Sequence, residues 1–239
     1  MKQFFLAGML LISLPVLSQP FHKKSNAGYQ GVEKYISLNF LSVAEPHFAL
    51  GPSAGIRFSE RSEVFAEAAY VGRGFTGTYS DLDRLSGARL IFQYRYHFLQ
   101  QWRPLINLGM RSRSMRERHQ PFVALEWRMK PLAFSGKATF VNESTADTLS
   151  GFSYRASSFT IGGALVFGST FNLSRDDRWK LEVSAGIGAK QRSVKLKNVP
   201  AGYQSYSAVK REWLYIPPPE VETGGVLLPI AIRLRYVLD

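Results

Sequence analysis

Apolar and polar side chains alternate at every second position along much of this chain. The clearest run lies at 89–98, and the same alternation marks 179–190 and 230–236. Because successive side chains of a β-strand point to opposite faces, these segments predict strands with one apolar and one polar face. The apolar positions of the first run are Leu90, Phe92, Tyr94, Tyr96 and Phe98.

Five further segments alternate less regularly, so the sequence predicts eight strands, most of them of nine to twelve residues. A tilted strand needs about 9–11 residues to cross a lipid bilayer, and these lengths suit such a crossing. The predicted fold is therefore all-β, an antiparallel up-and-down transmembrane β-barrel. The eight segments are 34–43, 48–58, 63–71, 89–98, 122–130, 158–168, 179–190 and 230–236.

The strand count has one alternative. With eight strands, 99–120 forms an unusually long connection. If 104–114 is a further strand and Pro131 divides the segment that follows, the count becomes ten. Both counts are even, as single-chain bacterial barrels require, and we favour eight.

The predicted connections alternate in length. Short polar turns are expected at 59–62 and 172–178, and longer loops at 72–85, 142–151 and 194–225. This alternation is typical of outer-membrane barrels, in which periplasmic turns are short and extracellular loops are longer.

The first 18 residues are predicted to be a secretory signal peptide. Lys2 supplies the positive charge, 4–17 is apolar, and Ser18 is a small residue suited to cleavage before Gln19. The apolar stretch is shorter than the ~20 residues of a spanning helix. The expected organisation is a signal peptide at 1–18, a polar N-terminal segment at 19–33 and a barrel domain at 34–239.

Alternation alone does not say which face meets lipid, because a soluble lipocalin-like barrel shows the same period with its faces reversed. Here the polar row carries charges of both signs, and Tyr and Trp recur near the strand ends, as in an aromatic girdle. We therefore expect the apolar row to face lipid and the polar row to form a charge network in the lumen. Its predicted members are Arg57, Glu67, Arg89, Arg95, Glu126, Arg128, Lys180, Glu182, Arg233 and Arg235.

The sequence contains no recognisable catalytic or metal-binding motif. It has no cysteine, and its four histidines form neither an HExxH motif nor a paired spacing, so no metal, cofactor or catalytic residue is predicted. The net charge of +12 is scattered rather than clustered, which does not favour nucleic-acid binding. His97 and His47 are the two candidates for an enzyme at the barrel rim, and a structural role is the simpler interpretation of both.

Four segments resemble the strands of a known family. Residues 93–98 and 121–128 are similar to the middle strands, and 181–188 and 229–236 to the last two strands, of small outer-membrane β-barrels of the Bacteroidota type, which are OmpW-like in style. The resemblance covers roughly residues 34–238. It implies an outer-membrane location in a Gram-negative cell envelope. It implies no catalytic residues that could be assigned to positions of this sequence.

The expected function is that of a structural or accessory outer-membrane barrel without enzymatic activity. The alternatives are a channel or transporter for small solutes, a lipid-modifying enzyme at the rim, and a soluble secreted barrel that binds a ligand. Expected partners are outer-membrane lipid and lipopolysaccharide, together with the barrel-assembly machinery during insertion. The sequence does not identify a further protein partner.

Overall fold

The computed structural model describes residues 32–40, 47–73, 82–98, 119–142, 144–174, 176–206 and 222–238. Strands dominate these residues, and none of the described segments is a helix long and apolar enough to cross a membrane. The strands are β1 (Glu33–Asn39), β2 (His47–Leu50), β3 (Pro52–Arg57), β4 (Ser62–Arg73), β5 (Leu82–His97), β6 (His119–Asn142), β7 (Thr148–Asn172), β8 (Trp179–Lys197), β9 (Tyr203–Ser205), β10 (Thr223–Leu227) and β11 (Ile230–Leu238).

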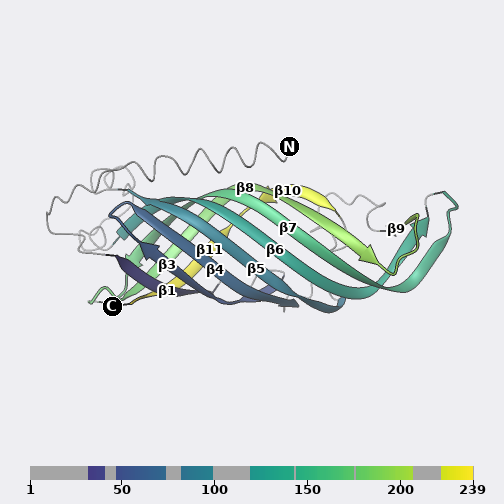
Figure 1. Cartoon of the computed structure of the whole chain (residues 1–239), viewed down its shortest axis with the longest axis horizontal. Coiled ribbons are helices and arrows are strands. Elements are labelled where there is room, and N and C mark those ends of the chain that lie inside the picture. The colour runs from purple at the N-terminus through teal and green to yellow at the C-terminus, as the bar shows by residue number, and fades with distance from the viewer. Residues whose placement is uncertain are drawn as a thin grey trace. The chain divides into compact units, whose positions relative to one another are not determined.

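Eight of these strands close into a ring. The hydrogen-bonded order is β8–β11–β1–β3–β4–β5–β6–β7, and β7 pairs back to β8 along its length. Every neighbouring pair in the ring is antiparallel, and Figure 1 shows the tilted strands β4 to β8 running side by side. The prediction of an all-β, antiparallel fold with eight principal strands is confirmed.

The ten-strand alternative required Pro131 to divide a segment, and the structure contradicts this. Pro131 lies inside β6 and pairs with Phe159 of β7. The pairing with β5 runs to Leu90↔Met129 and resumes at Gly87↔Leu132, so it is interrupted at the proline. Proline has no backbone N–H to donate, so the pairing with β5 is interrupted at Pro131 while the pairing with β7 continues. The other candidate strand, 104–114, lies outside the described residues.

The middle strands are longer than the alternation predicted. β6 has 24 residues and β7 has 25, and the hairpin that they form continues beyond Gly136, where β5 stops pairing with β6. The loops expected at 72–85, 142–151 and 194–225 are therefore partly strand. At these ends large apolar residues such as Leu132, Phe134 and Tyr154 point inward and polar residues point outward, so the two rows exchange faces while the backbone pairing continues.

The apolar row faces outward and the polar row faces the interior of the ring. Phe167 is 55% exposed and Ile187 is 62% exposed, whereas Arg95 and Glu182 are 0% exposed. The register keeps outward residues next to outward residues, as in the pair Leu165↔Ile187 on β7 and β8. From the turn end to the middle of the ring the apolar row therefore lies outside and the polar row inside, as the sequence predicts.

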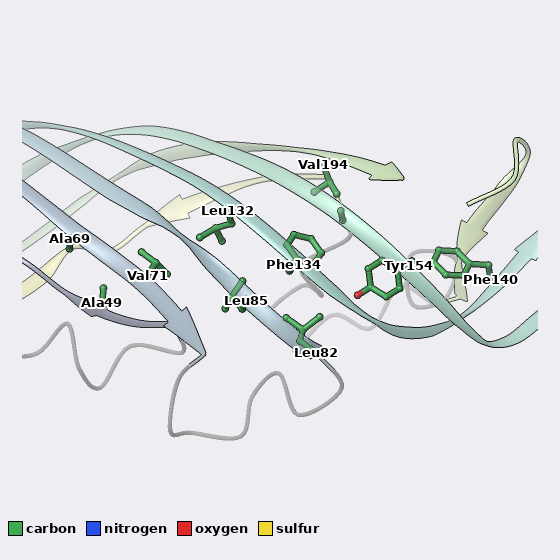
Figure 2. Close-up of a cluster of buried hydrophobic side chains, with 11 residues drawn as sticks. Ala49, Ala69, Val71, Leu82, Leu85, Leu132, Phe134, Phe140, Tyr154 and Val194 are labelled. Carbon is green, nitrogen blue, oxygen red and sulfur yellow. The ribbon is translucent and has the colours of Figure 1, made fainter. Parts of the chain in front are cut away.

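The interior changes character from one end of the ring to the other. We call the end with the short connections 58–61 and 173–178 the turn end, and the end with the β6–β7 hairpin the loop end. Charged residues fill the interior from the turn end to the middle. Toward the loop end an apolar cluster takes over, in which Phe134, Tyr154 and Phe140 make edge-to-face contacts (Figure 2). We call this cluster the apolar end section.

Candidate functional site: an enclosed ionic network

The charged interior is built by alternate positions of six strands. Each contributing residue lies on the inward face of its strand, because the opposite face carries the apolar row. We call the resulting set the ionic network. Its members are Tyr35 on β1, Glu63 and Glu67 on β4, Arg89, Gln93, Arg95 and His97 on β5, Glu126 and Arg128 on β6, Glu182 on β8, and Arg233 and Arg235 on β11.

Glu182 is the first centre of the network, and three arginines surround its carboxylate. Arg233 donates from Nη1 to Oε1 at 2.7 Å. Arg95 donates from Nη1 to Oε2 at 3.0 Å and from Nη2 to Oε1 at 3.2 Å. Arg235 donates from Nε to Oε2 at 2.5 Å and also contacts that oxygen through Nη2. Such charge-assisted bonds are the strongest hydrogen bonds available to side chains.

Glu63 is the second centre. Its Oε1 accepts from the Tyr35 hydroxyl at 2.5 Å, from Arg95 Nη1 at 2.7 Å and from Arg235 Nη2 at 3.2 Å. His97 Nε2 lies 3.0 Å from the other carboxylate oxygen. Arg95 and Arg235 therefore each bridge Glu63 and Glu182, which ties β4 to β8 across the interior.

Two branches extend the network toward the middle of the ring. In the first, Glu67 accepts from Arg89 at 2.6 Å and from Arg233 at 3.4 Å. In the second, Gln93 accepts from Arg95 Nε at 2.6 Å and donates to Glu126 at 2.6 Å.

Arg128 closes the second branch, with Nη2 2.9 Å from Glu126 Oε1. Arg95 is bonded through all three guanidinium nitrogens and links the second branch to both centres. Arg233 links the first branch to Glu182, so the branches and the centres form one connected network.

Aromatic rings fill the space around the guanidinium groups. Arg95 lies 4.1 Å from the centroid of Phe65 and 4.9 Å from that of Phe122, and Arg235 lies 4.3 Å from the Tyr35 ring. Contacts of this kind stabilise a cation and exclude water at the same time. The interior near the turn end is therefore packed as well as charged.

Two of these rings lie over glycines on the next strand. A Cβ atom at Gly55 would lie 2.1 Å from the Tyr35 hydroxyl, and one at Gly168 would lie 2.3 Å from Cζ of Phe122. Tyr35 and Gly55 are direct register partners, as are Phe122 and Gly168. Because glycine has no side chain, these two positions leave the space that the aromatic side chains of Tyr35 and Phe122 occupy in the narrow interior.

The opposite charges in the network nearly balance. Four carboxylates, those of Glu63, Glu67, Glu126 and Glu182, face five guanidiniums, and each carboxylate accepts from at least one of them. A buried ion without such a partner costs several kcal/mol. The arrangement therefore tolerates the burial of these charges only as long as it stays complete. The guanidiniums belong to Arg89, Arg95, Arg128, Arg233 and Arg235.

Eight of the ten residues expected in a charge network lie in it, namely Glu67, Arg89, Arg95, Glu126, Arg128, Glu182, Arg233 and Arg235. The other two lie nearer the turn end. Lys180 donates to both carboxylate oxygens of Glu33, at 2.8 and 2.9 Å. Arg57 donates to Gln120 Oε1 at 2.8 Å and to the carbonyl oxygen of Ser59 at 3.3 Å.

The sequence reasoning missed three important members. Glu63 stands four residues before Glu67 on the same face of β4, so period two alone already implied its position. Gln93 lies on the polar face of the run 89–98 but carries no charge, so a search for charged residues passes over it. Tyr35 carries no charge and was therefore not among the expected members, although Ser37 and Asn39 lie on the same face of β1 and mark it as the polar one.

The two histidines considered for a rim enzyme have different outcomes. His97 is only 2% exposed, and its ring packs on Phe122 with centroids 5.7 Å apart, so it serves the interior rather than an open rim. The side chain of His47 lies outside the described residues. No group of residues able to hold a metal ion occurs in the part of the chain that the structure describes.

No family model matches this sequence, and no match was found among the curated proteins. Function is therefore inferred from the fold and from the ionic network.

Proposed function

We propose that this chain is a non-enzymatic β-barrel of the Gram-negative outer membrane, with a structural or accessory role and a closed interior. Export through a cleaved signal peptide at 1–18 and insertion by the barrel-assembly machinery belong to the same proposal. The observation that supports it is the inversion of the two faces: large apolar side chains cover the outside of the ring, while glutamates and arginines fill the inside.

This inversion fits a lipid environment and does not fit water. In water the favourable term in folding is the removal of apolar surface, and this chain leaves side chains such as Phe159, Phe167 and Ile187 outside. Acyl chains cover such surface, and a closed ring leaves no unpaired strand edge within the hydrocarbon. The ion pairs, in turn, are shielded from lipid by the wall of the barrel.

The height of the apolar band agrees with a bilayer. On β7 the outward residues from Phe159 to Phe171 span twelve residue steps, or about 40 Å along the strand at ~3.3 Å per step. With the strand tilt of ~45° common in such barrels, this is about 28 Å along the membrane normal, close to the ~25 Å apolar band of outer-membrane proteins. At the turn end the rings of Trp179 and Tyr236 pack with centroids 4.9 Å apart, as in an aromatic girdle.

A closed interior distinguishes this proposal from a channel. Arg89, Arg95, Arg233 and Arg235 are each no more than 2% exposed and are bonded from one wall to the other. An eight-stranded barrel is just wide enough for side chains to fill its interior. We therefore expect no continuous water path and no steady conductance. The resemblance to Bacteroidota-type barrels agrees with this role and remains a prediction.

Four measurements test the proposal. Cell fractionation is expected to place the mature chain in the outer membrane, and the folded protein is expected to migrate differently on a gel before and after boiling. A mature chain that stays folded and monodisperse in water without detergent would overturn the membrane assignment. Sustained opening of the reconstituted protein in a planar bilayer would overturn the closed interior and favour a channel.

A further inference from the structure

Basic residues gather on the outer face of four adjacent strands near the loop end. The register places Arg84 of β5 opposite Ser135 of β6, Ser135 opposite Arg155 of β7, and Arg155 opposite Lys197 of β8. Arg84, Arg155 and Lys197 are all exposed, so three cations lie on one row across the outside of the wall.

Two more cations flank this row. Lys195 lies two residues from Lys197 on the same face of β8, and Lys137 lies two residues from Ser135 on β6; both are exposed. We call these five residues, Arg84, Lys137, Arg155, Lys195 and Lys197, the basic row. Acidic groups nearby are Asp83, which precedes Arg84, and Glu222, which accepts from Ser193 at 3.3 Å. Neither forms an ion pair with the basic row among the described residues.

The basic row lies just beyond the apolar band. On β7, Phe159 is exposed on the outer face, and Arg155 is four residues nearer the loop end. Four residues correspond to about 13 Å along a strand and, at a tilt of ~45°, to about 9 Å along the membrane normal. This is the level at which lipid headgroups begin above the acyl chains.

The wall beneath the row is firmly packed. The residues that alternate with it point inward into the apolar end section: Tyr154 and Ala156 flank Arg155, and Val194 and Leu196 flank Lys195. Figure 2 shows Tyr154 and Val194 in this cluster. The backbone positions of the cations are therefore fixed before any ligand binds, which lowers the entropy cost of binding.

Arg155 and Lys197 are direct register partners, so an anion between them would offset their repulsion. Like charges directly opposite each other on antiparallel strands destabilise a sheet, so this pair costs free energy unless a counter-ion offsets the repulsion. Phosphate is well suited, because a guanidinium binds it through two parallel N–H donors and an ammonium adds a compact charge.

We infer that the basic row binds the phosphate groups of a phosphorylated lipid in the outer leaflet, such as the lipid portion of lipopolysaccharide. A lipid fits better than a free anion because Phe159 and Ile161, four and six residues from Arg155 along β7 toward the turn end, are exposed and offer apolar contact to acyl chains. This inference rests on the proposed function, since only a barrel that spans the membrane places the row at headgroup level.

The test uses the mature protein folded in phosphatidylcholine nanodiscs that contain a small fraction of either phosphorylated lipid A or its dephosphorylated form. Lipid that stays with the protein after detergent exchange is counted by native mass spectrometry. The variant is Arg155→Gln with Lys197→Gln. The control is Lys34→Gln with Arg61→Gln, which removes the same charge from exposed positions at the turn end.

We expect the wild type to retain phosphorylated lipid A at least tenfold better than the dephosphorylated form. The Arg155/Lys197 variant should lose about tenfold of this retention, because each cation near an anionic surface contributes separately. The control should stay within twofold of the wild type. Rising salt should weaken retention by the wild type, which gives a second reading that depends on no variant.

The two possible failures differ. If the wild type inserts and shows the gel shift, but the variant retains phosphorylated lipid A equally well, or both lipid forms are retained equally, the inference is wrong and the barrel assignment stands. If the wild type neither inserts nor shifts on the gel, the proposed function itself fails.

Discussion

Arg95 and Glu182 meet across the interior of the ring, although β5 and β8 are not neighbours in the sheet. The guanidinium places Nη1 3.0 Å and Nη2 3.2 Å from the two carboxylate oxygens, and both side chains are fully enclosed. This bond joins opposite walls, whereas backbone pairing joins only adjacent strands. The ionic network thus links strands across the interior. Its removal should lower the stability of the barrel and open its interior to water.

Removal of the Glu182 charge tests the first effect. Glu182→Gln leaves Arg95, Arg233 and Arg235 around a neutral amide, so we expect the free energy of unfolding to fall by about 3–5 kcal/mol, as for a broken buried ion pair. Urea titration of the protein folded in phosphatidylcholine vesicles measures this. Asp147→Asn, at an exposed position between β6 and β7, should change stability by no more than about 0.5 kcal/mol. Equal stability of the two variants would contradict the role of Glu182 as a centre.

Closure is tested by removing a matched pair of charges. Arg95→Ser with Glu63→Ser deletes the most highly bonded guanidinium and one carboxylate while leaving the net charge unchanged. We expect discrete conductance steps in a planar bilayer where the wild type shows none, because the space left between Phe65 and Phe122 admits water. Lys180→Ser with Glu33→Ser, a neutral pair nearer the turn end, is the control and should stay closed.

The packing of Tyr35 over Gly55 gives a third prediction. Gly55→Ala places a methyl group 2.1 Å from the Tyr35 hydroxyl, so the ring must shift and its bond to Glu63 is strained. We expect a loss of about 1–3 kcal/mol in unfolding free energy, typical of overpacking. At Gly163 an added Cβ meets only the carbonyl oxygen of Glu126 at 3.6 Å, so Gly163→Ala should be close to neutral. A thermal gel-shift series of both variants compares them directly, and matching transition temperatures would rule out the steric explanation.

Period two was sufficient to predict the eight strands of the ring and, from the turn end to its middle, the orientation of their faces. Runs such as 89–98 and 179–190 carry bulky apolar residues on one side and ions on the other, and no other regular structure satisfies both sides at once. The inward charges Arg89, Arg95 and Glu182 followed from this orientation alone. What the pattern specifies is the face of each residue, because face depends only on whether its position in a strand is odd or even.

The partners within the network depend on register and ring closure, which period two does not contain. That Arg95 bridges Glu63 and Glu182 requires β4 and β8 to face each other across the interior, and their residues are 119 positions apart in the chain numbering. The change from a charged to an apolar interior at Leu132 was likewise not predicted. Leu85, Leu132 and Phe134 depart from the local alternation, and only the folded structure shows that they pack together in one cluster.

Two tryptophans on the outer face provide a depth measurement of the proposed membrane position. Trp127 pairs with Phe92 of β5 and Gly163 of β7 in the middle of the apolar band, whereas Trp179 begins β8 at the turn end. In variants that keep one tryptophan and carry phenylalanine at the other three positions, we expect lipids brominated deep in the acyl chain to quench Trp127 more strongly. Lipids brominated near the headgroup should quench Trp179 more strongly, because an interfacial aromatic residue lies at that level. Both tryptophans stay accessible to brominated lipid only if the apolar row faces the bilayer, so an absence of quenching at both positions would place the outer face elsewhere.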